Sequence, residues 1–311
     1  EGLGFSGVLF RSEAMMGALF LGGSTSLPGI ITSVTAAWNG YPELAISNAV
    51  GGIAAQTVFL AVADICYRRA NLEHAAASIA NLIQGTLLTT LLLIPILAYA
   101  GPDISFWGVH PATPVLFFAY CFGLRMVSTV QSRPMWEPRK TKDTTFDQPE
   151  QDLSQTSLTK LWSQFAIYAL IVAVCGYLIG QSGIAIASQT SLSESLVGTL
   201  LTAVSTSLPE LVTTIAAVRN GALMLAVGGI IGGNCFDLLF MAFADVAYRP
   251  GSIYSAISAQ QLFSIALTAL MTGVLILGLL RRQQYGFANI GFESVLILGL
   301  YLSGVVILFL G

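Results

Sequence analysis

Two segments of this chain repeat each other, and this duplication limits the possible folds more than any other feature. Residues 12–68 align with residues 193–249 without a gap, at a constant offset of 181 positions, and 23 of the 57 aligned pairs are identical. The strongest matches are STSLPGIITSVTAAWNG (residues 24–40) and STSLPELVTTIAAVRNG (residues 205–221). The sequence therefore predicts two related halves. One difference stands out, because Gly29 of the first copy is replaced by Glu210 in the second.

The composition places both copies in a membrane. Hydrophobic residues make up 55% of the chain and charged residues only 9%, whereas soluble domains carry about 25% charged residues. Apolar runs of about 20 residues indicate membrane-spanning helices. Nine are predicted, at 12–37, 42–65, 75–99, 111–129, 160–180, 194–218, 222–247, 258–280 and 290–310. The lipid bilayer is thus an expected partner, and the absence of a basic tail or patch argues against nucleic acid.

The two copies are predicted to lie upside down relative to each other. Five predicted helices separate their starting points, and an odd number reverses the direction of crossing. Inverted repeats are typical of secondary transporters. Twelve of the thirteen Lys and Arg residues fall on one side when the 130–159 loop is cytoplasmic, in agreement with the positive-inside rule. The short linker suits a prokaryotic protein, so we expect the prokaryotic inner membrane.

The predicted fold class is an all-α polytopic membrane protein with two inverted repeats of five transmembrane helices. A helix at 160–180 precedes the second copy, but no matching helix precedes the first. We therefore expect one more helix upstream of Glu1, with both termini outside in the full-length chain. The predicted division is a first repeat at 1–130, a polar cytoplasmic linker at 131–159 and a second repeat at 160–311.

The second copy concentrates oxygen-bearing side chains at a predicted helix break. Pro209 cannot donate a backbone hydrogen bond and its ring clashes with the preceding turn, so it should free carbonyl oxygens near the membrane midplane. Thr206 and Ser207 add hydroxyl groups and Glu210 adds a carboxylate. A carboxylate inside the membrane costs about 2–3 kcal/mol or more, which makes it a candidate functional group.

A second acid follows in the next predicted helix. Asp237 ends the glycine-rich segment GGIIGGNCFD, and glycines allow helices to approach closely. Glu210 and Asp237 could therefore hold one cation between adjacent helices, because hard cations prefer oxygen ligands. The first copy offers only neutral groups at the matching positions. The predicted cation ligands are Thr25, Ser26, Gln56, Thr206, Ser207, Glu210 and Asp237.

Three other acids are interpreted as structural. Asp64 and Asp245 occupy matching positions, each shortly before a Tyr-Arg pair. They are predicted to anchor the helix end at the membrane interface through a local Asp–Arg contact. Glu293, near another predicted helix end, is predicted to be an interface charge.

The doubled motif resembles the two alpha-repeats of the calcium/cation antiporter superfamily, to which the sodium/calcium exchangers belong. STSLPELVTTIAA followed by GGIIGGNCFD is similar to the second repeat, and STSLPGIITSVTAA followed by SNAVGG to the first. The resemblance implies ten helices in two inverted halves and exchange of calcium against sodium or protons by alternating access. It implies no cofactor besides these transported cations, and it assigns ligand roles to Thr25, Ser26, Thr206, Ser207, Glu210 and Asp237.

The chain also departs from the family pattern. The family has Glu where Gly29 stands and Ser where Gly52 and Gly233 stand. In the first repeat it also has Asn where Ile53 stands, and Asn or Asp where Gln56 stands. One central carboxylate is therefore missing, and divalent affinity follows ligand charge.

Three hypotheses stay open: a secondary cation antiporter, an exchanger of monovalent cations, protons or magnesium, and a cation-binding relative without transport. No nucleophile–base pair or phosphate loop indicates an enzyme, and the sequence leaves the oligomeric state open.

Overall fold

The structure, a computed structural model, describes residues 23–67, 69–132, 134–135, 137–144, 158–286 and 290–310. Every named element in these ranges is a helix. Seven of the described helices are long and apolar enough to cross a membrane, and a bent helix pair supplies an eighth span if it is counted as one. The all-α membrane class is confirmed. The beginning of the predicted span at 12–37, most of the predicted linker and the expected upstream helix lie outside the described residues.

The first half contains α2 (Leu27–Trp38), α3 (Pro42–Cys66), α4 (Leu72–Ala75), α5 (Ile79–Ala100) and α6 (Ala112–Ser132). The second half contains α7 (Leu158–Gln189), α8 (Glu194–Leu196), the π-helical turn η1 (Val197–Thr202), α9 (Ala203–Thr206), α10 (Leu208–Arg219), α11 (Leu223–Asp237), α12 (Leu239–Ala247), α13 (Ile253–Ala256), α14 (Ala259–Arg281) and α15 (Phe292–Leu310).

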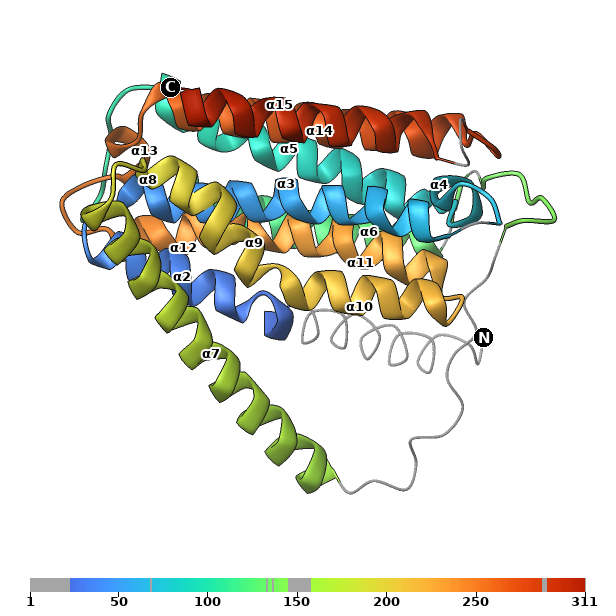
Figure 1. The fold of residues 1–311 in the computed structure, drawn as a ribbon, viewed down its shortest axis with the longest axis horizontal. Helices are drawn as coiled ribbons and strands as arrows, with labels where there is room; N and C mark the ends of the chain where they lie inside the picture. The colour runs from blue at the N-terminus through green and yellow to red at the C-terminus, as the bar shows by residue number, and fades with distance from the viewer. Residues whose placement is uncertain are drawn as a thin grey trace.

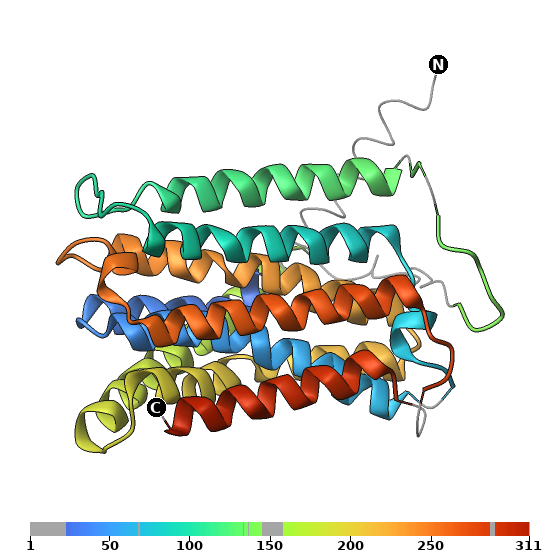
Figure 2. The same cartoon turned by 90° about the horizontal axis from the view of Figure 1, so that it is seen from above.

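The centre of the bundle is formed by the repeat-related helices α3 and α11–α12. They run in opposite directions (Figure 1), as an inverted repeat requires. Helices α6, α5, α14 and α15 form a row beside this centre (Figure 2), with neighbours in the row in contact. Helix α7 lies obliquely at the edge and packs against α2. The bundle therefore surrounds α3, which is buried over most of its length.

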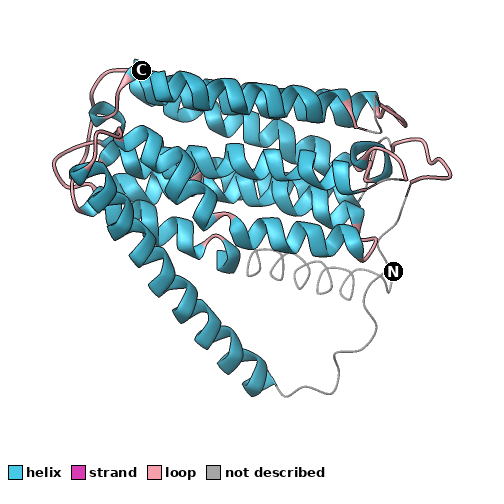
Figure 3. Ribbon diagram, viewed as in Figure 1, coloured by secondary structure: helices cyan, strands magenta, loops and turns pink. Residues whose placement is uncertain are grey.

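Helix breaks occur at related places in the two halves. The segment Glu194–Thr206 meets Leu208–Arg219 at an angle of 45°, and Pro209 lies in the first turn of α10, as predicted. In the first half the helix is interrupted at Ser26, and Pro28 lies in the first turn of α2. Figure 3 shows these short non-helical interruptions in the middle of the bundle. Each proline stands where its missing N–H costs no helical hydrogen bond.

The predicted Asp–Arg contact is wrong for Asp245. Its carboxylate is fully buried and accepts hydrogen bonds from Ile253 N (2.9 Å), His110 N (2.8 Å) and Thr113 Oγ1 (2.6 Å). Arg249 instead donates to a backbone carbonyl of its own helix end. A buried carboxylate is stabilised by several short donors rather than by one flexible arginine. Asp245 thus joins the end of α12 to the starts of α13 and α6.

Asp64 has the same arrangement at the opposite end of the bundle. It accepts hydrogen bonds from Leu72 N (2.7 Å), Gly291 N (2.9 Å) and Ser294 Oγ (3.0 Å). Each of these donors is 181 positions from its counterpart around the other aspartate, so the repeat continues into the last helix of each half. Arg68 lies outside the described residues. Glu293, predicted to be an interface charge, is buried, with 1% of its surface exposed.

Candidate cation-binding site

Asp237 lies where the two halves meet. It is the last residue of α11, directly before the break at Leu238, and 1% of its surface is exposed. Its Oδ1 accepts a hydrogen bond from Ser26 Oγ (2.5 Å) and its Oδ2 accepts one from Gln56 Nε2 (2.5 Å). Both donors belong to the first repeat. The structure therefore brings together three of the predicted ligand residues on α11, α3 and the start of α2.

The same contacts are partly duplicated by the repeat. Gln56 Nε2 also lies 3.4 Å from Ser207 Oγ. Gln56 is the counterpart of Asp237, and Ser207 is the counterpart of Ser26, so the two hydrogen-bonded pairs are related by the repeat. The pseudo-symmetry axis passes among these four side chains. A site on this axis is reached equally from both halves, which suits alternating exposure.

Glu210 brings the second carboxylate. It lies in the first turn of α10, where the helix dipole favours negative charge. Its surface is 6% exposed, and neither carboxylate oxygen accepts a well-formed hydrogen bond from the residues that the structure describes, although the Thr25 side chain interacts with it and the Asp237 carboxylate is close enough to repel it. An ionised carboxylate without a partner is costly inside a protein. A bound cation or a proton would remove that cost.

Further buried oxygens lie on the same helices. Gln56 Oε1 and Asn234 Oδ1 have no hydrogen-bond partner among the described residues, while Asn234 Nδ2 donates to Thr57 Oγ1 (3.3 Å). Together with the Glu210 carboxylate they leave four acceptor atoms open on α3, α10 and α11. Such oxygens suit a hard cation.

Thr206 lies in a neighbouring hydrogen-bond network. Its hydroxyl contacts Ala203 O (3.1 Å) and Asn48 Oδ1 (3.4 Å). The Asn48 amide in turn donates to Gly29 O (3.2 Å) and Ser33 Oγ (2.9 Å). Thr206 is therefore held against α3, apart from the hydrogen bonds around Asp237. Asn48 and Ser33 were not among the predicted ligands; the only signal was a lone amide within an apolar helix.

The position of the missing third carboxylate is filled by an aromatic ring. A Cβ atom on Gly29 would lie 3.0 Å from Phe240 Cζ and 3.2 Å from Cδ2, and closer still to Cε2. Phe240 belongs to α12 and is buried. The site therefore contains two carboxylates, and any side chain at position 29 would press against the Phe240 ring.

Comparisons with known proteins show what the whole chain is similar to. The sequence model described as "Sodium/calcium exchanger protein" matches residues 4–134 and 160–310. A putative antiporter, CaxA of Alkalimonas amylolytica, is 27% identical over 87% of this chain and 82% of its own length. The sodium/calcium exchanger MaX1 of Methanosarcina acetivorans is 27% identical over 46% of this chain and 40% of its own length. Among solved structures, the sodium-calcium exchanger NCX_Mj shares the fold, with a TM-score of 0.57, 22% identity and coverage of 94% of this chain and 86% of that one.

Proposed function

The chain belongs to the sodium/calcium exchanger protein family and is an integral membrane protein, and we propose that it is a cation antiporter that exchanges cations by alternating access at the Glu210–Asp237 site. The observation that carries this proposal is the pair of buried carboxylates on two helices that both break at the site. The transported cations would be its substrates, and we propose no other cofactor.

The charge of the site limits what each crossing can carry. Glu210 and Asp237 supply two negative charges, which one calcium ion or two monovalent cations would neutralise. Because bare charge is costly within the membrane, the site would cross only when loaded with cations or protons. This requirement couples the movement of one ion to the return of another. Thr25, Ser26, Gln56, Thr206 and Ser207 would supply neutral oxygens or hold the carboxylates in place.

A specific observation favours a second candidate. Phe240 occupies the space beside Gly29, and Gly29 itself supplies none of the additional negative charge that would strengthen calcium binding. Exchange of monovalent cations, protons or magnesium is therefore the alternative to exchange of calcium. A cation-binding relative that does not transport remains the third hypothesis.

Flux in proteoliposomes separates these alternatives. We expect sodium-gradient-driven calcium uptake that Glu210→Gln and Asp237→Asn abolish, while Glu137→Gln, which neutralises an exposed acid, keeps it. Calcium-independent sodium or proton counterflow that depends on Glu210 would establish the second candidate. Wild-type transport by Glu210→Gln would show that the site is wrong. Retained cation binding with no counterflow in any gradient would identify a non-transporting protein.

We also propose that the linker lies in the cytoplasm of a prokaryote, with both termini outside in the full-length chain. The distribution of Lys and Arg supports this orientation. A single cysteine at Lys142, exposed in the linker, should react with a membrane-impermeant thiol reagent only after the cells are permeabilised. Labelling in intact cells would reverse the assignment.

A further inference from the structure

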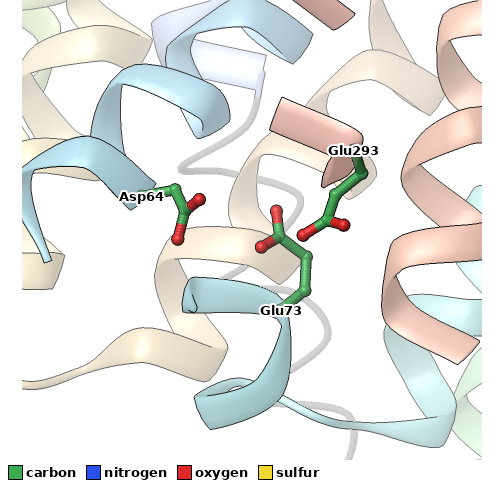
Figure 4. A group of neighbouring side chains, drawn as sticks. All are labelled: Asp64, Glu73 and Glu293. Atoms are coloured by element: carbon green, nitrogen blue, oxygen red, sulfur yellow. The ribbon is translucent and has the colours of Figure 1, made fainter. Parts of the chain in front are cut away.

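A second group of acids lies at the end of the bundle next to the linker. Asp64 lies near the end of α3, Glu73 lies in α4, and Glu293 lies in the first turn of α15. One carboxylate oxygen from each lies within 4.8 Å of the other two, and all three residues are buried. Figure 4 shows the three carboxyl groups turned toward one another. This acidic triad joins the first half of the chain to the last helix of the second.

Two oxygens in the acidic triad are left without partners. Glu73 Oε2 and Glu293 Oε2 accept no hydrogen bond among the described residues, although each residue is only 1% exposed. A proton shared between Glu73 and Glu293 would satisfy one oxygen of each. It would leave both Oε2 atoms unpaired and would not neutralise Asp64. A cation among the three carboxylates would contact all of them.

The local charges match a divalent ion. Arg281 is the positive group that acts on Glu293, and its guanidinium lies 4.8 Å from the centre of the Phe292 ring. With all three carboxyl groups ionised, the acidic triad and the one guanidinium together keep a net charge of two negative units. The acidic triad therefore has an excess of negative charge that its own surroundings do not neutralise.

The opposite end of the bundle provides an internal comparison. Asp245 accepts the same three hydrogen bonds there as Asp64 does here, but Tyr254 stands at the position of Glu73 and Ala112 at the position of Glu293. The Tyr254 ring packs edge-on against His110 with ring centres 5.4 Å apart. The aspartate thus joins the helix ends without further acids. The two glutamates are an addition to a joint that is complete without them.

The backbone leaves room for this addition. A Cβ atom on Gly278 of α14 would lie 2.7 Å from Glu293 Cδ, and one on Gly291 would lie 2.6 Å from the same atom. Any side chain at either position would displace the Glu293 carboxyl. These glycines allow the carboxyl group to turn toward Asp64 and Glu73.

We propose that Asp64, Glu73 and Glu293 form a second binding site, for a hard divalent cation such as calcium or magnesium. The ion links α3 and α4 of the first half to α15 of the second. The site is separate from the exchange site, because Asp64 lies eight residues beyond Gln56 on α3, about 12 Å along the helix axis. It needs no transport to be occupied.

Divalent binding tests the proposal in full-length protein whose exchange site is disabled by Glu210→Gln and Asp237→Asn. Radioactive calcium in equilibrium dialysis, with magnesium as competitor, should show one ion per chain, and calcium should raise the unfolding temperature. Adding Glu73→Gln should weaken binding roughly tenfold or more, because affinity follows the ligand charge. Tyr254→Phe, at the related position of the opposite end, should leave binding unchanged.

A second variant and a second measurement keep the test decisive. Glu293→Gln should weaken binding as Glu73→Gln does, and in both the thermal shift with calcium should disappear. The proposal fails if no divalent ion binds in the disabled background, or if both variants bind as tightly as their parent. It also fails if stability rises as the pH falls and is independent of divalent cations, because a protonated carboxyl pair would then explain the acidic triad.

Discussion

Replacing Gly29 by alanine tests whether Phe240 fills the space that a side chain at this position needs. The added Cβ would lie 3.0 and 3.2 Å from two ring atoms of Phe240 and closer to a third, whereas carbon atoms pack best at about 3.5–4.0 Å. Overpacking of this kind costs about 1–3 kcal/mol. Alanine gains about 0.5–1 kcal/mol over glycine within a helix. The net loss of unfolding free energy should therefore be about 0–2.5 kcal/mol.

A second glycine serves as a control that separates the overpacking cost from the gain of replacing glycine by alanine in a helix. Gly273 in α14 has no atom within 4 Å of the position of a Cβ, so Gly273→Ala should be neutral or stabilising. Gly29→Ala should then be less stable than Gly273→Ala by about 1–3 kcal/mol, the overpacking cost alone. Equilibrium unfolding in mild detergent measures both variants under the same conditions.

A double-mutant cycle tests the assigned cause. Phe240→Leu removes the ring atoms that the new methyl group would meet, so Gly29→Ala should become nearly harmless in that background. Interaction energies between contacting residues are commonly about 0.5–3 kcal/mol. If Gly29→Ala is as stable as Gly273→Ala, or if its effect is the same with and without Phe240, the packing argument is refuted.

Two further predictions concern the exchange site. Ser26→Ala removes a donor 2.5 Å from Asp237 and should cost about 1.5–3 kcal/mol of unfolding free energy in cation-free protein. Ser207→Ala removes the acceptor of a longer bond, 3.4 Å from Gln56, and should cost clearly less. Equal losses in the two variants would show that the short bond to Asp237 contributes no more than the long one. Gly29→Glu alone should impair folding, whereas Gly29→Glu with Phe240→Ala should fold and bind calcium more tightly than the parent in equilibrium dialysis. Unchanged calcium affinity in the folded double variant would show that the added carboxylate points away from the site.

Much of the fold follows from the sequence, because its signals are periodic and duplicated. Hydropathy placed the spans, and Pro209 marked the broken helix whose bend the structure places at Ser207. The repeat alignment paired Gln56 with Asp237, and the structure joins them by a hydrogen bond. An alignment shows which positions correspond, however, and says nothing about the distance between them in space. Their contact depends on both helices crossing the pseudo-symmetry axis.

The roles of other residues were not accessible from the sequence. Phe240 matches Phe59 of the first copy, so the alignment gives no sign that one of these rings blocks position 29. Asp64 and Asp245 were assigned to nearby arginines because sequence proximity was the only available guide. Their actual partners include backbone N–H groups more than a hundred residues away, and a backbone donor has no sequence signature.

The two aspartate joints also determine which helices would travel together. Asp245, in the second half, holds the start of α6 from the first half, while Asp64, in the first half, holds the start of α15 from the second. Each half is thus hydrogen-bonded to the final helix of the other half, α6 or α15. If one part of the protein rocks against the rest, α6 should follow α12 and α15 should follow α3. The mechanical units of this protein would then be assembled across the duplication, and would differ from the two gene-level copies.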